Sequence, residues 1–201
     1  IGENDQIINT IEAERILIAT GSRPRHPIEI PSDKKTFVDS DIIFRLDHLP
    51  KTMIVLGGGV IGCEYATMFA AVGIKVILMD RRDNLLRFLD VEIGQRFREY
   101  IQKLEIDVRM NQRIKELRTS EEGQAEVLME GGESVRADCL FYSLGRIANL
   151  DTMQLDKVGL TVDKLGNLPV NSLFQTVVPH IYAAGDVIGP PGLASTSMEQ
   201  G

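Results

Sequence analysis

The stretch from Lys51 to Arg87 constrains the fold of this chain more than any other, because it has the pattern of a complete βαβ unit. A short apolar run, Met53-Ile54-Val55-Leu56, ends in Gly57-Gly58-Gly59-Val60-Ile61-Gly62. A helical pattern follows, and a second apolar run, Val76-Ile77-Leu78-Met79, ends at Asp80. Strands joined through a helix in this way pair in parallel. We therefore predict an α/β fold around a parallel sheet.

The spaced glycines Gly57, Gly59 and Gly62 favour a nucleotide pyrophosphate as the ligand of this unit. They permit a tight turn, close approach of a phosphate to the backbone, and close packing of the helix on the strand. The following residues, Val60 and Ile61, open the helix, whose free amides and positive dipole end face that position. We predict that these five residues bind a dinucleotide. The alternative is an ordinary turn between a strand and a helix.

The residues after the second strand carry chemistry for the adenosine ribose. Asp80 lies 18 positions after Gly62, where a ribose hydroxyl needs an acceptor. A carboxylate there favours NAD, whereas the guanidinium groups of Arg81 and Arg87 favour the 2′-phosphate of NADP. Asp80 could instead be an ordinary polar residue at a strand end, and the arginines a solvated loop. We expect Arg82 to be solvated.

Composition excludes several classes of function. The 201 residues carry a formal net charge of −7, so we expect no nucleic-acid partner, since phosphate contacts need clustered Lys and Arg. No apolar run reaches the length of a membrane span, and we expect no membrane association. The two cysteines, Cys63 and Cys139, form neither a disulfide framework nor a metal-ligand spacing. We expect no metal site and a reducing, cytoplasmic environment.

Hydrophobic patterning predicts two helices in this region. The helix after the glycines should run from about residue 60 to residue 72, and the second should begin at Asp90, a favoured N-cap residue. The inward residues expected for the first helix are Ile61, Tyr65, Met68, Phe69 and Val72. Those expected for the second are Ile93, Phe97, Tyr100 and Leu104.

The remaining strands surround this unit. Ile7–Ile11, Arg15–Thr20 and His180–Ala184 should be strands, the second of them buried on both faces. Further along, Ile106–Met110 should be a strand and Cys139–Leu144 a buried one. Between these two, we predict an antiparallel meander of three short strands: Ile114–Thr119, Ala125–Met129 and Ser134–Ala137.

Four separate stretches resemble the FAD-dependent pyridine nucleotide–disulfide oxidoreductase family. They are Ala19–Pro24, Gly57–Gly62 with Glu64, Gly145-Arg146 with Asn149, and Ala184-Gly185-Asp186, in the family's order and spacing. The resemblance implies a Rossmann-like NAD(P)-binding domain, a parallel sheet with an antiparallel meander, inserted into a FAD-binding domain. Residues 49–166 would form the NAD(P)-binding domain. Residues 1–48 and 167–201 would be partial FAD-domain segments.

The resemblance also implies roles for individual residues. Glu64 would lie near the nicotinamide ring and act as the catalytic residue. Arg81 and Arg87 stand one and seven positions past Asp80, where NADP-using relatives carry basic residues. One chain with both an acid and these arginines suits an enzyme that accepts both nucleotides.

The later stretches would contribute to the cofactor sites. Gly145 and Arg146 would border the NAD site and the adjoining domain, although a helix-entry turn explains them equally well. Asp186, with Gly185 beside it, would accept a hydrogen bond from the ribityl chain of FAD.

The resemblance implies a flavoprotein that passes hydride between NADPH or NADH and NAD or NADP through FAD, as the family's soluble transhydrogenases do. The alternative is dihydrolipoamide dehydrogenase or another flavin disulfide reductase, with a CxxxxC pair upstream. The first FAD-binding motif would precede Ile1, and a C-terminal domain that makes a homodimer would follow Gly201. We therefore expect this chain to be a nucleotide-binding module that is inactive alone.

Overall fold

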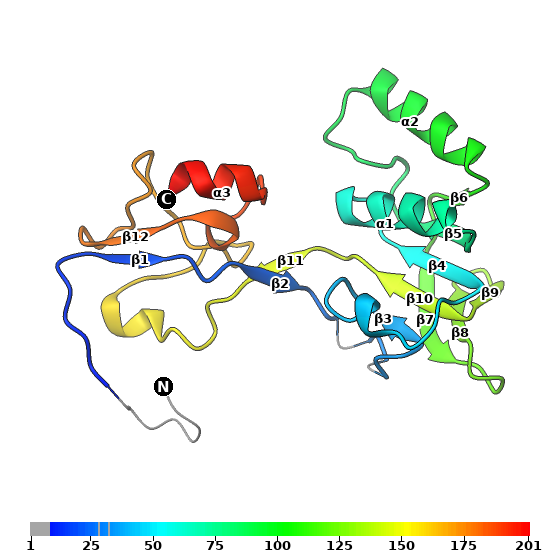
Figure 1. Cartoon of the computed structure of the whole chain (residues 1–201), viewed down its shortest axis with the longest axis horizontal. Coiled ribbons are helices and arrows are strands. Elements are labelled where there is room, and N and C mark those ends of the chain that lie inside the picture. The colour runs from blue at the N-terminus through cyan, green and yellow to red at the C-terminus, as the bar shows by residue number, and fades with distance from the viewer. Residues whose placement is uncertain (1–8, 28, 32) are drawn as a thin grey trace. The chain divides into compact units, whose positions relative to one another are not determined.

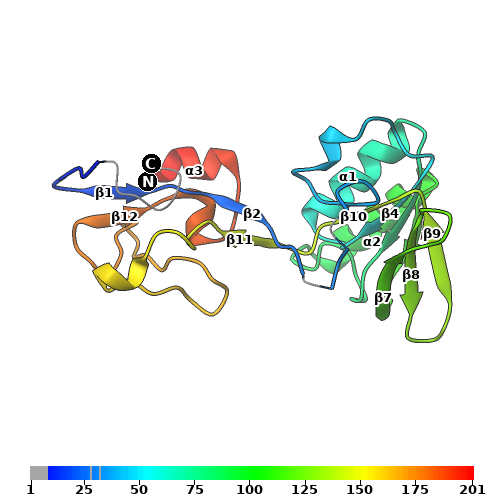
Figure 2. The ribbon, with the colours of Figure 1, turned by 90° about the horizontal axis from the view of Figure 1, so that it is seen from below.

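A computed structural model describes residues 9–27, 29–31 and 33–201 of the chain. They divide into two compact units (Figures 1 and 2). The central unit is Pro24–Gly145, and the split unit is Ile1–Arg23 together with Arg146–Gly201. The central unit begins before the boundary expected near residue 48, because Phe37–Val38 pairs into its sheet. It ends before the one expected near residue 166, because Arg146–Ala148 pairs instead with Ser22–Pro24.

Each unit has its own set of helices and strands. The central unit contains β3 (Phe37–Val38), η1 (Ile43–Arg45), β4 (Thr52–Leu56), α1 (Val60–Ala71), β5 (Lys75–Met79), α2 (Val91–Lys103), β6 (Asp107–Arg109), β7 (Ile114–Thr119), β8 (Ala125–Met129), β9 (Ser134–Ala137) and β10 (Cys139–Tyr142). The split unit contains β1 (Ile16–Ile18), β11 (Arg146–Ala148), η2 (Leu155–Val158), β12 (Ile181–Ala183), η3 (Gly185–Ile188) and α3 (Ala194–Gln200), with β2 (Ser22–Pro24) reaching the boundary. Ile7 and Ile8 of the first predicted strand lie outside the described residues, and residues 9–11 form no strand.

The central unit is built on a parallel sheet with the strand order β3-β10-β4-β5-β6. The register pairs Leu56 of β4 with Met79 of β5 and with Tyr142 of β10. The carboxyl ends of these three strands therefore lie at one edge of the sheet. The residues that follow them, which include the glycine-rich turn and Asp80, start from that edge. The predicted α/β fold is confirmed.

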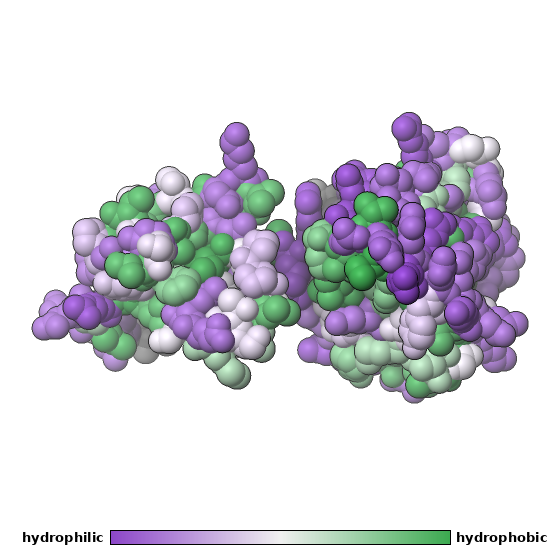
Figure 3. Space-filling model, turned by 90° about the horizontal axis from the view of Figure 1, so that it is seen from above, coloured by the Kyte–Doolittle hydropathy of each residue, from purple (hydrophilic) through white to green (hydrophobic). Residues whose placement is uncertain are grey.

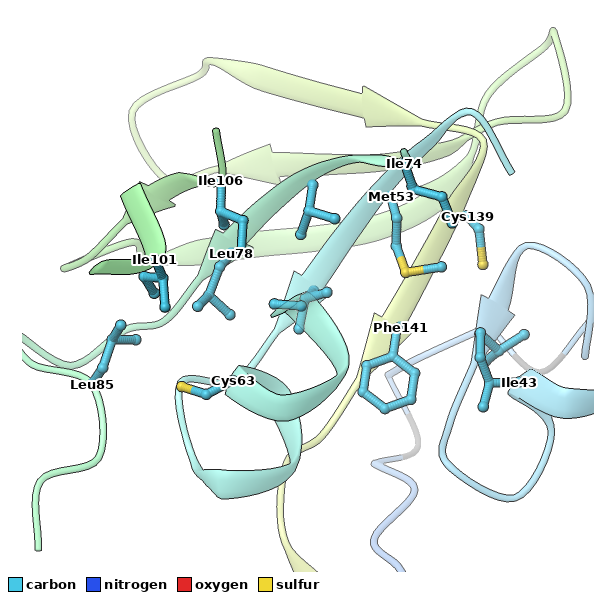
Figure 4. Close-up of a cluster of buried hydrophobic side chains, with 14 of the residues drawn as sticks. Ile43, Met53, Cys63, Ile74, Leu78, Leu85, Ile101, Ile106, Cys139 and Phe141 are labelled. Atoms are coloured by element: carbon cyan, nitrogen blue, oxygen red, sulfur yellow. The ribbon is translucent and has the colours of Figure 1, made fainter. Parts of the chain in front are cut away.

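The two faces of this sheet bury different partners, because successive side chains of a strand point to opposite faces. Met53 and Val55 face a core that includes Cys63 of α1 and Ile101 of α2, and Figure 4 shows this core around α1. On the other face, Ile54 of β4, Met79 of β5 and Leu140 of β10 pack against β8 and β9. The meander β7-β8-β9 has the predicted bounds, and it forms a separate antiparallel sheet against the opposite face.

The inward face of α1 agrees with the prediction in part, since Ile61, Tyr65 and Phe69 pack against the core. Cys63 and Ala66 are buried, whereas Met68 is 53% and Val72 61% exposed. The face that approaches the sheet carries small residues, which allow close contact. Because apolar side chains lie all round this helix, periodicity alone could not identify that face.

Helix α2 begins as predicted, since Asp90 accepts a hydrogen bond from Glu92 N at 2.9 Å. Its fully buried residue is Ile101. Of the predicted inward residues, Phe97 and Leu104 pack against the core, whereas Ile93 and Tyr100 are exposed. On the face seen in Figure 3, exposed hydrophobic side chains lie in patches among hydrophilic ones. No helix among the described residues is long and apolar enough to span a membrane.

The split unit has two small sheets, β1-β12 and β11-β2. Strands β1 and β12 pair in parallel, with Ile18 opposite Ala183 in a small core. The expectation that β1 is buried on both faces is wrong, because Ile16 is 45% and Leu17 54% exposed. Within the described residues β1 has β12 as its only strand neighbour, which leaves Ile16 and Leu17 about half exposed.

Candidate functional site

The glycine-rich turn after β4 is possible only with glycine at two of its positions. Gly57 has a φ of +116°, and a Cβ there would stand 2.5 Å from the carbonyl oxygen of Ser143. A Cβ on Gly62 would stand 1.8 Å from the carbonyl oxygen of Gly57. These contacts bring the start of α1 directly against the strand ends, as the glycine spacing predicts.

Gly59 differs from its neighbours because it faces open space. It is the N-cap residue of α1, with a φ of −81°, and a Cβ there would meet no atom within 4 Å. The next two residues, Val60 and Ile61, begin the helix, and amides of a first turn have no partner inside the helix. The first turn carries no acidic residue. An anion can therefore reach the free amides from the open side of Gly59.

Asp80 follows β5 at the same edge of the sheet and is 5% exposed. Its Oδ2 accepts hydrogen bonds from Gly58 N at 2.6 Å and from Arg82 Nη2 at 2.5 Å. Its Oδ1 accepts hydrogen bonds from the backbone amide of Arg82 at 2.8 Å and from Nε at 2.9 Å. The expectation that Arg82 is solvated holds only in part: its side chain is 37% exposed, but its Nε and Nη2 both donate to this carboxylate.

This ion pair keeps Asp80 charged. Burial alone would raise the pKa of Asp80, but the hydrogen bonds from Arg82 and Gly58 outweigh it, and the pKa lies below its ordinary value. The same contact with Asp80 raises the pKa of Arg82. At neutral pH a buried carboxylate and a half-buried guanidinium therefore face each other beside the glycine-rich turn.

The other predicted residues of the central unit lie on its surface. Arg81 and Arg87 are exposed and make no ion pair within the part of the chain that the structure describes. Glu64 is also exposed, and it is the fifth residue of α1. It therefore lies in the second turn of the helix. The helix dipole acts mainly within the first turn, so it explains little of Glu64's presence.

Ser143 is a contributor that sequence reasoning missed. Its side-chain hydroxyl donates toward the carbonyl oxygens of Leu56 and Gly57, at 3.3 Å each, and its backbone amide donates to Leu56 O at 2.8 Å. Ser143 thus supports the glycine-rich turn from the neighbouring strand end. The available signal was its position directly after a buried strand.

A second polar cluster lies in the split unit, around Asp186. Ser22 Oγ donates to Asp186 Oδ2 at 2.7 Å, and Arg146 Nε donates to Ser22 Oγ at 2.7 Å. Arg146 Nε lies 3.7 Å from Asp186 Oδ2. Arg146 and Asp186, which the sequence analysis singled out separately, therefore belong to one cluster. Ser22 joins them and was not predicted.

Two glycines directly precede members of this cluster in the sequence, Gly145 before Arg146 and Gly185 before Asp186. Gly185 has a φ of +79° and donates its amide to Gln200 Oε1 at 2.7 Å. Gly145 has a φ of +103° and is the last residue of the central unit. The side chain of Asp186 is 29% exposed, and its Oδ1 accepts no hydrogen bond from the described residues. That oxygen is available to a ligand hydroxyl, so the cluster fits the predicted contact with FAD.

The two cysteines are buried and free. Burial raises the pKa of Cys63 and that of Cys139 to about 12, so both are thiols rather than reactive thiolates. Among the residues whose placement is described, no group of His, Cys, Asp and Glu could hold a metal ion.

Comparison with known proteins gives one consistent result at the level of sequence. Residues 3–201 match the family described as "Pyridine nucleotide-disulphide oxidoreductase". The chain is 41% identical, over 198 residues, to the soluble pyridine nucleotide transhydrogenase of Klebsiella pneumoniae subsp. pneumoniae, and this covers 98% of the chain and 42% of that protein. It is 44% identical, over 197 residues, to the protein of that name from Sodalis glossinidius, with coverages of 98% and 42%.

Solved structures agree with the sequence comparison. The fold matches LpdA from Mycobacterium tuberculosis with a TM-score of 0.86 and 26% identity, over 94% of this chain and 41% of that one. It matches RclA from Escherichia coli, a HOCl-induced flavoprotein disulfide reductase, with a TM-score of 0.86 and 28% identity, over 94% and 43%. The chain thus spans about two fifths of the length of the relatives it matches.

Proposed function

The chain belongs to the pyridine nucleotide-disulphide oxidoreductase family, and on that premise we propose that its central unit binds a nicotinamide dinucleotide at the turn from Gly57 to Gly62. The observation that carries this proposal is the open side of Gly59 above the first turn of α1. There the pyrophosphate accepts hydrogen bonds from the amides of Val60 and Ile61 and meets the positive end of the helix dipole.

The end of β5 supplies contacts to the adenosine ribose in this proposal. Asp80 accepts a hydrogen bond from the ribose diol of NAD, while Arg81 and Arg87 attract the 2′-phosphate of NADP. Both arginines are exposed and free to move toward a ligand. One site then accepts either nucleotide, which is what transfer of hydride between the two requires.

FAD, which accepts and returns a hydride when bound, is the second cofactor of the proposed enzyme. The cluster in the split unit contributes to its site. Asp186 accepts a hydrogen bond from the ribityl chain, and Arg146 and Ser22 hold that carboxylate in place. Gly185 allows the chain to turn beside it, and Gly145 precedes Arg146 at the border of the central unit.

The proposed activity is that of a cytoplasmic flavoprotein, homodimeric through a further domain, that exchanges reducing equivalents between NADPH or NADH and NAD or NADP. Its support is the identity of 41–44% to soluble transhydrogenases. Glu64, on the exposed side of α1, is the proposed residue next to the nicotinamide ring. The second candidate is a flavin disulfide reductase, which the structural likeness to RclA favours. Its redox cysteines cannot be Cys63 and Cys139, because both are buried thiols.

Replacing Gly59 by aspartate tests the nucleotide site. The position has space and a φ that any residue adopts, and aspartate is a favoured N-cap, so the variant should fold. Its carboxylate would bind the free amides and repel the pyrophosphate. We expect NADH and NADPH, titrated calorimetrically, to bind at least about tenfold more weakly to Gly59→Asp.

The matched control is Gly94→Asp, at another glycine with open space, on α2. This variant should bind both nucleotides as the unchanged chain does. Unaltered binding by Gly59→Asp would refute the proposed position of the pyrophosphate.

A further inference from the structure

The carboxylate at the end of β5 is already fully occupied within the protein. Asp80 accepts four hydrogen bonds, three from Arg82 and one from Gly58 N, at 2.5–2.9 Å. About four is the acceptor capacity of a carboxylate. A ribose hydroxyl can therefore bind Asp80 only after the side chain of Arg82 leaves it.

We propose that Arg82 determines nucleotide selectivity at this site by covering Asp80 when NADP(H) binds and by leaving Asp80 when NAD(H) binds. The inference rests on the proposed nucleotide site and deepens it. In this inference the side chain of Arg82 takes one position for NADP(H) and another for NAD(H). The sequence analysis instead assigned recognition of NAD to Asp80 and recognition of NADP to Arg81 and Arg87.

Arg82 keeps donors free for a phosphate while it covers Asp80. A guanidinium has five N–H donors, and in this pair Nε and one hydrogen of Nη2 point at the carboxylate. Within the described residues Nη1 donates to no acceptor, and the side chain is 37% exposed. The outer edge of the guanidinium therefore faces solvent and can donate paired hydrogen bonds to a 2′-phosphate.

Charge favours the same arrangement. An uncovered Asp80 would repel a 2′-phosphate, whereas the ion pair with Arg82 removes that repulsion. NAD carries a diol in place of the phosphate and needs an acceptor instead. When the side chain of Arg82 moves out, the two acceptor positions that Nε and Nη2 occupied become available, and the hydrogen bond from Gly58 N at 2.6 Å still holds the glycine-rich turn.

Arg81 and Arg87 do not provide this alternation. Both are exposed, and neither contacts Asp80 in the described structure. They supply positive charge near the 2′-phosphate in either state. Arg82 alone changes whether the carboxylate is free.

The experiment compares Arg82→Ala with the unchanged chain by calorimetric titration of NADH and of NADPH. We expect NADPH to bind at least about tenfold more weakly to the variant, since it loses a charge-assisted contact and meets an uncovered Asp80. NADH should bind equally well or more tightly. Arg96→Ala is the matched control, because Arg96 also pairs with a carboxylate, that of Glu92, but on exposed helix α2. It should leave both affinities unchanged.

Removing Arg82 leaves Asp80 buried without its partner, so circular dichroism and a melting curve check that Arg82→Ala is folded. Arg82→Lys is the second variant, for use if Arg82→Ala does not fold. Lysine keeps the positive charge but cannot make the two parallel hydrogen bonds to Asp80. It should lower the preference for NADPH over NADH in the same direction by a smaller factor.

A second readout follows the side chain itself. In ¹⁵N NMR spectra the Nε–H signal of Arg82, assigned from its absence in Arg82→Lys, should persist with NADPH and shift or broaden with NADH. Equal losses for both nucleotides, no loss for either, or an unchanged signal with NADH would overturn the inference. If the unchanged chain binds neither nucleotide, the proposed function itself has failed.

Discussion

Gly62 lies against the carbonyl oxygen of Gly57, five residues earlier, so closely that a Cβ on Gly62 would stand 1.8 Å from that oxygen. Ser143 closes the other side, since its Oγ would stand 2.7 Å from the same Cβ. The backbone at Gly57 is held in place, because Gly57 N donates a hydrogen bond to Met79 O at 2.9 Å. The carbonyl oxygen of Gly57 therefore cannot move away alone. The approach of α1 to the strand ends depends on the missing side chain of Gly62.

Gly62→Ala should lower the free energy of unfolding by about 3 kcal/mol, the upper range for forcing an extra carbon into a packed site. Urea denaturation followed by circular dichroism measures it. The control is Gly94→Ala, where a Cβ meets nothing within 4 Å in α2. That change should stabilise by about 0.5–1 kcal/mol, because alanine favours the helix over glycine. Equal effects of the two substitutions would contradict the packing argument.

Glu126 of β8 sits between two arginines. Arg118 Nε donates to its Oε2 at 2.6 Å, and Arg136 Nε donates to its Oε1 at 2.8 Å. Hydrogen bonds from Arg118 and then Arg136 lower the pKa of Glu126 to about 2, against a usual value of 4.5. A carboxyl whose pKa is depressed in the folded state stabilises above its unfolded pKa and loses that contribution as the pH falls.

Glu126→Gln should therefore destabilise the chain at pH 7 and remove part of its pH dependence. The difference in urea midpoint between the variant and the unchanged chain should shrink between about pH 4.5 and pH 2. Glu116→Gln, at an exposed carboxylate on the neighbouring strand β7, is the control and should change little. A Glu126→Gln difference that is constant over this pH range would show that the arginines do not hold the charge.

Both cysteines should be unreactive in the folded chain. Their thiols are buried and their pKa values are raised to about 12, so little thiolate forms at pH 8. A thiol reagent should label neither cysteine in the native protein and both in guanidinium chloride. Rapid labelling of the native chain would mean that the core around Cys63 or Cys139 opens.

The elements of the central unit were predicted well wherever a sequence pattern is compatible with only one type of secondary structure. Short stretches separated by glycine-containing turns predicted β7, β8 and β9 with the observed bounds, and Asp90 marked the start of α2. The inward face of α1 was predicted only in part: Ile61, Tyr65 and Phe69 pack against the core, whereas the closest approach is made by small residues, because Gly62 lies against Gly57. No periodicity records such a contact.

Loop conformations and long-range clusters were harder to predict. The pairing of Arg82 with Asp80 depends on the conformation of the loop at residues 80–86. A hydrogen bond from Leu86 N to Gly58 O at 2.9 Å holds that conformation. Ser22 and Asp186 meet although they are 164 residues apart. The resemblance to a family pointed to Asp186, but nothing local to Ser22 indicated its partner.

The double substitution Arg81→Ala with Arg87→Ala should weaken NADPH binding selectively. We expect a loss of about tenfold for NADPH and little change for NADH, since two exposed cations act on the 2′-phosphate through a field that reaches about 10 Å at moderate ionic strength. Calorimetry at low and at high salt measures both nucleotides, and the NADPH effect should shrink as salt rises. The control replaces Arg96 and Arg113, which are exposed arginines paired with Glu92 and Glu130. An equal loss for both nucleotides would place Arg81 and Arg87 on the shared part of the ligand, and a salt-independent loss would indicate fixed direct contacts instead.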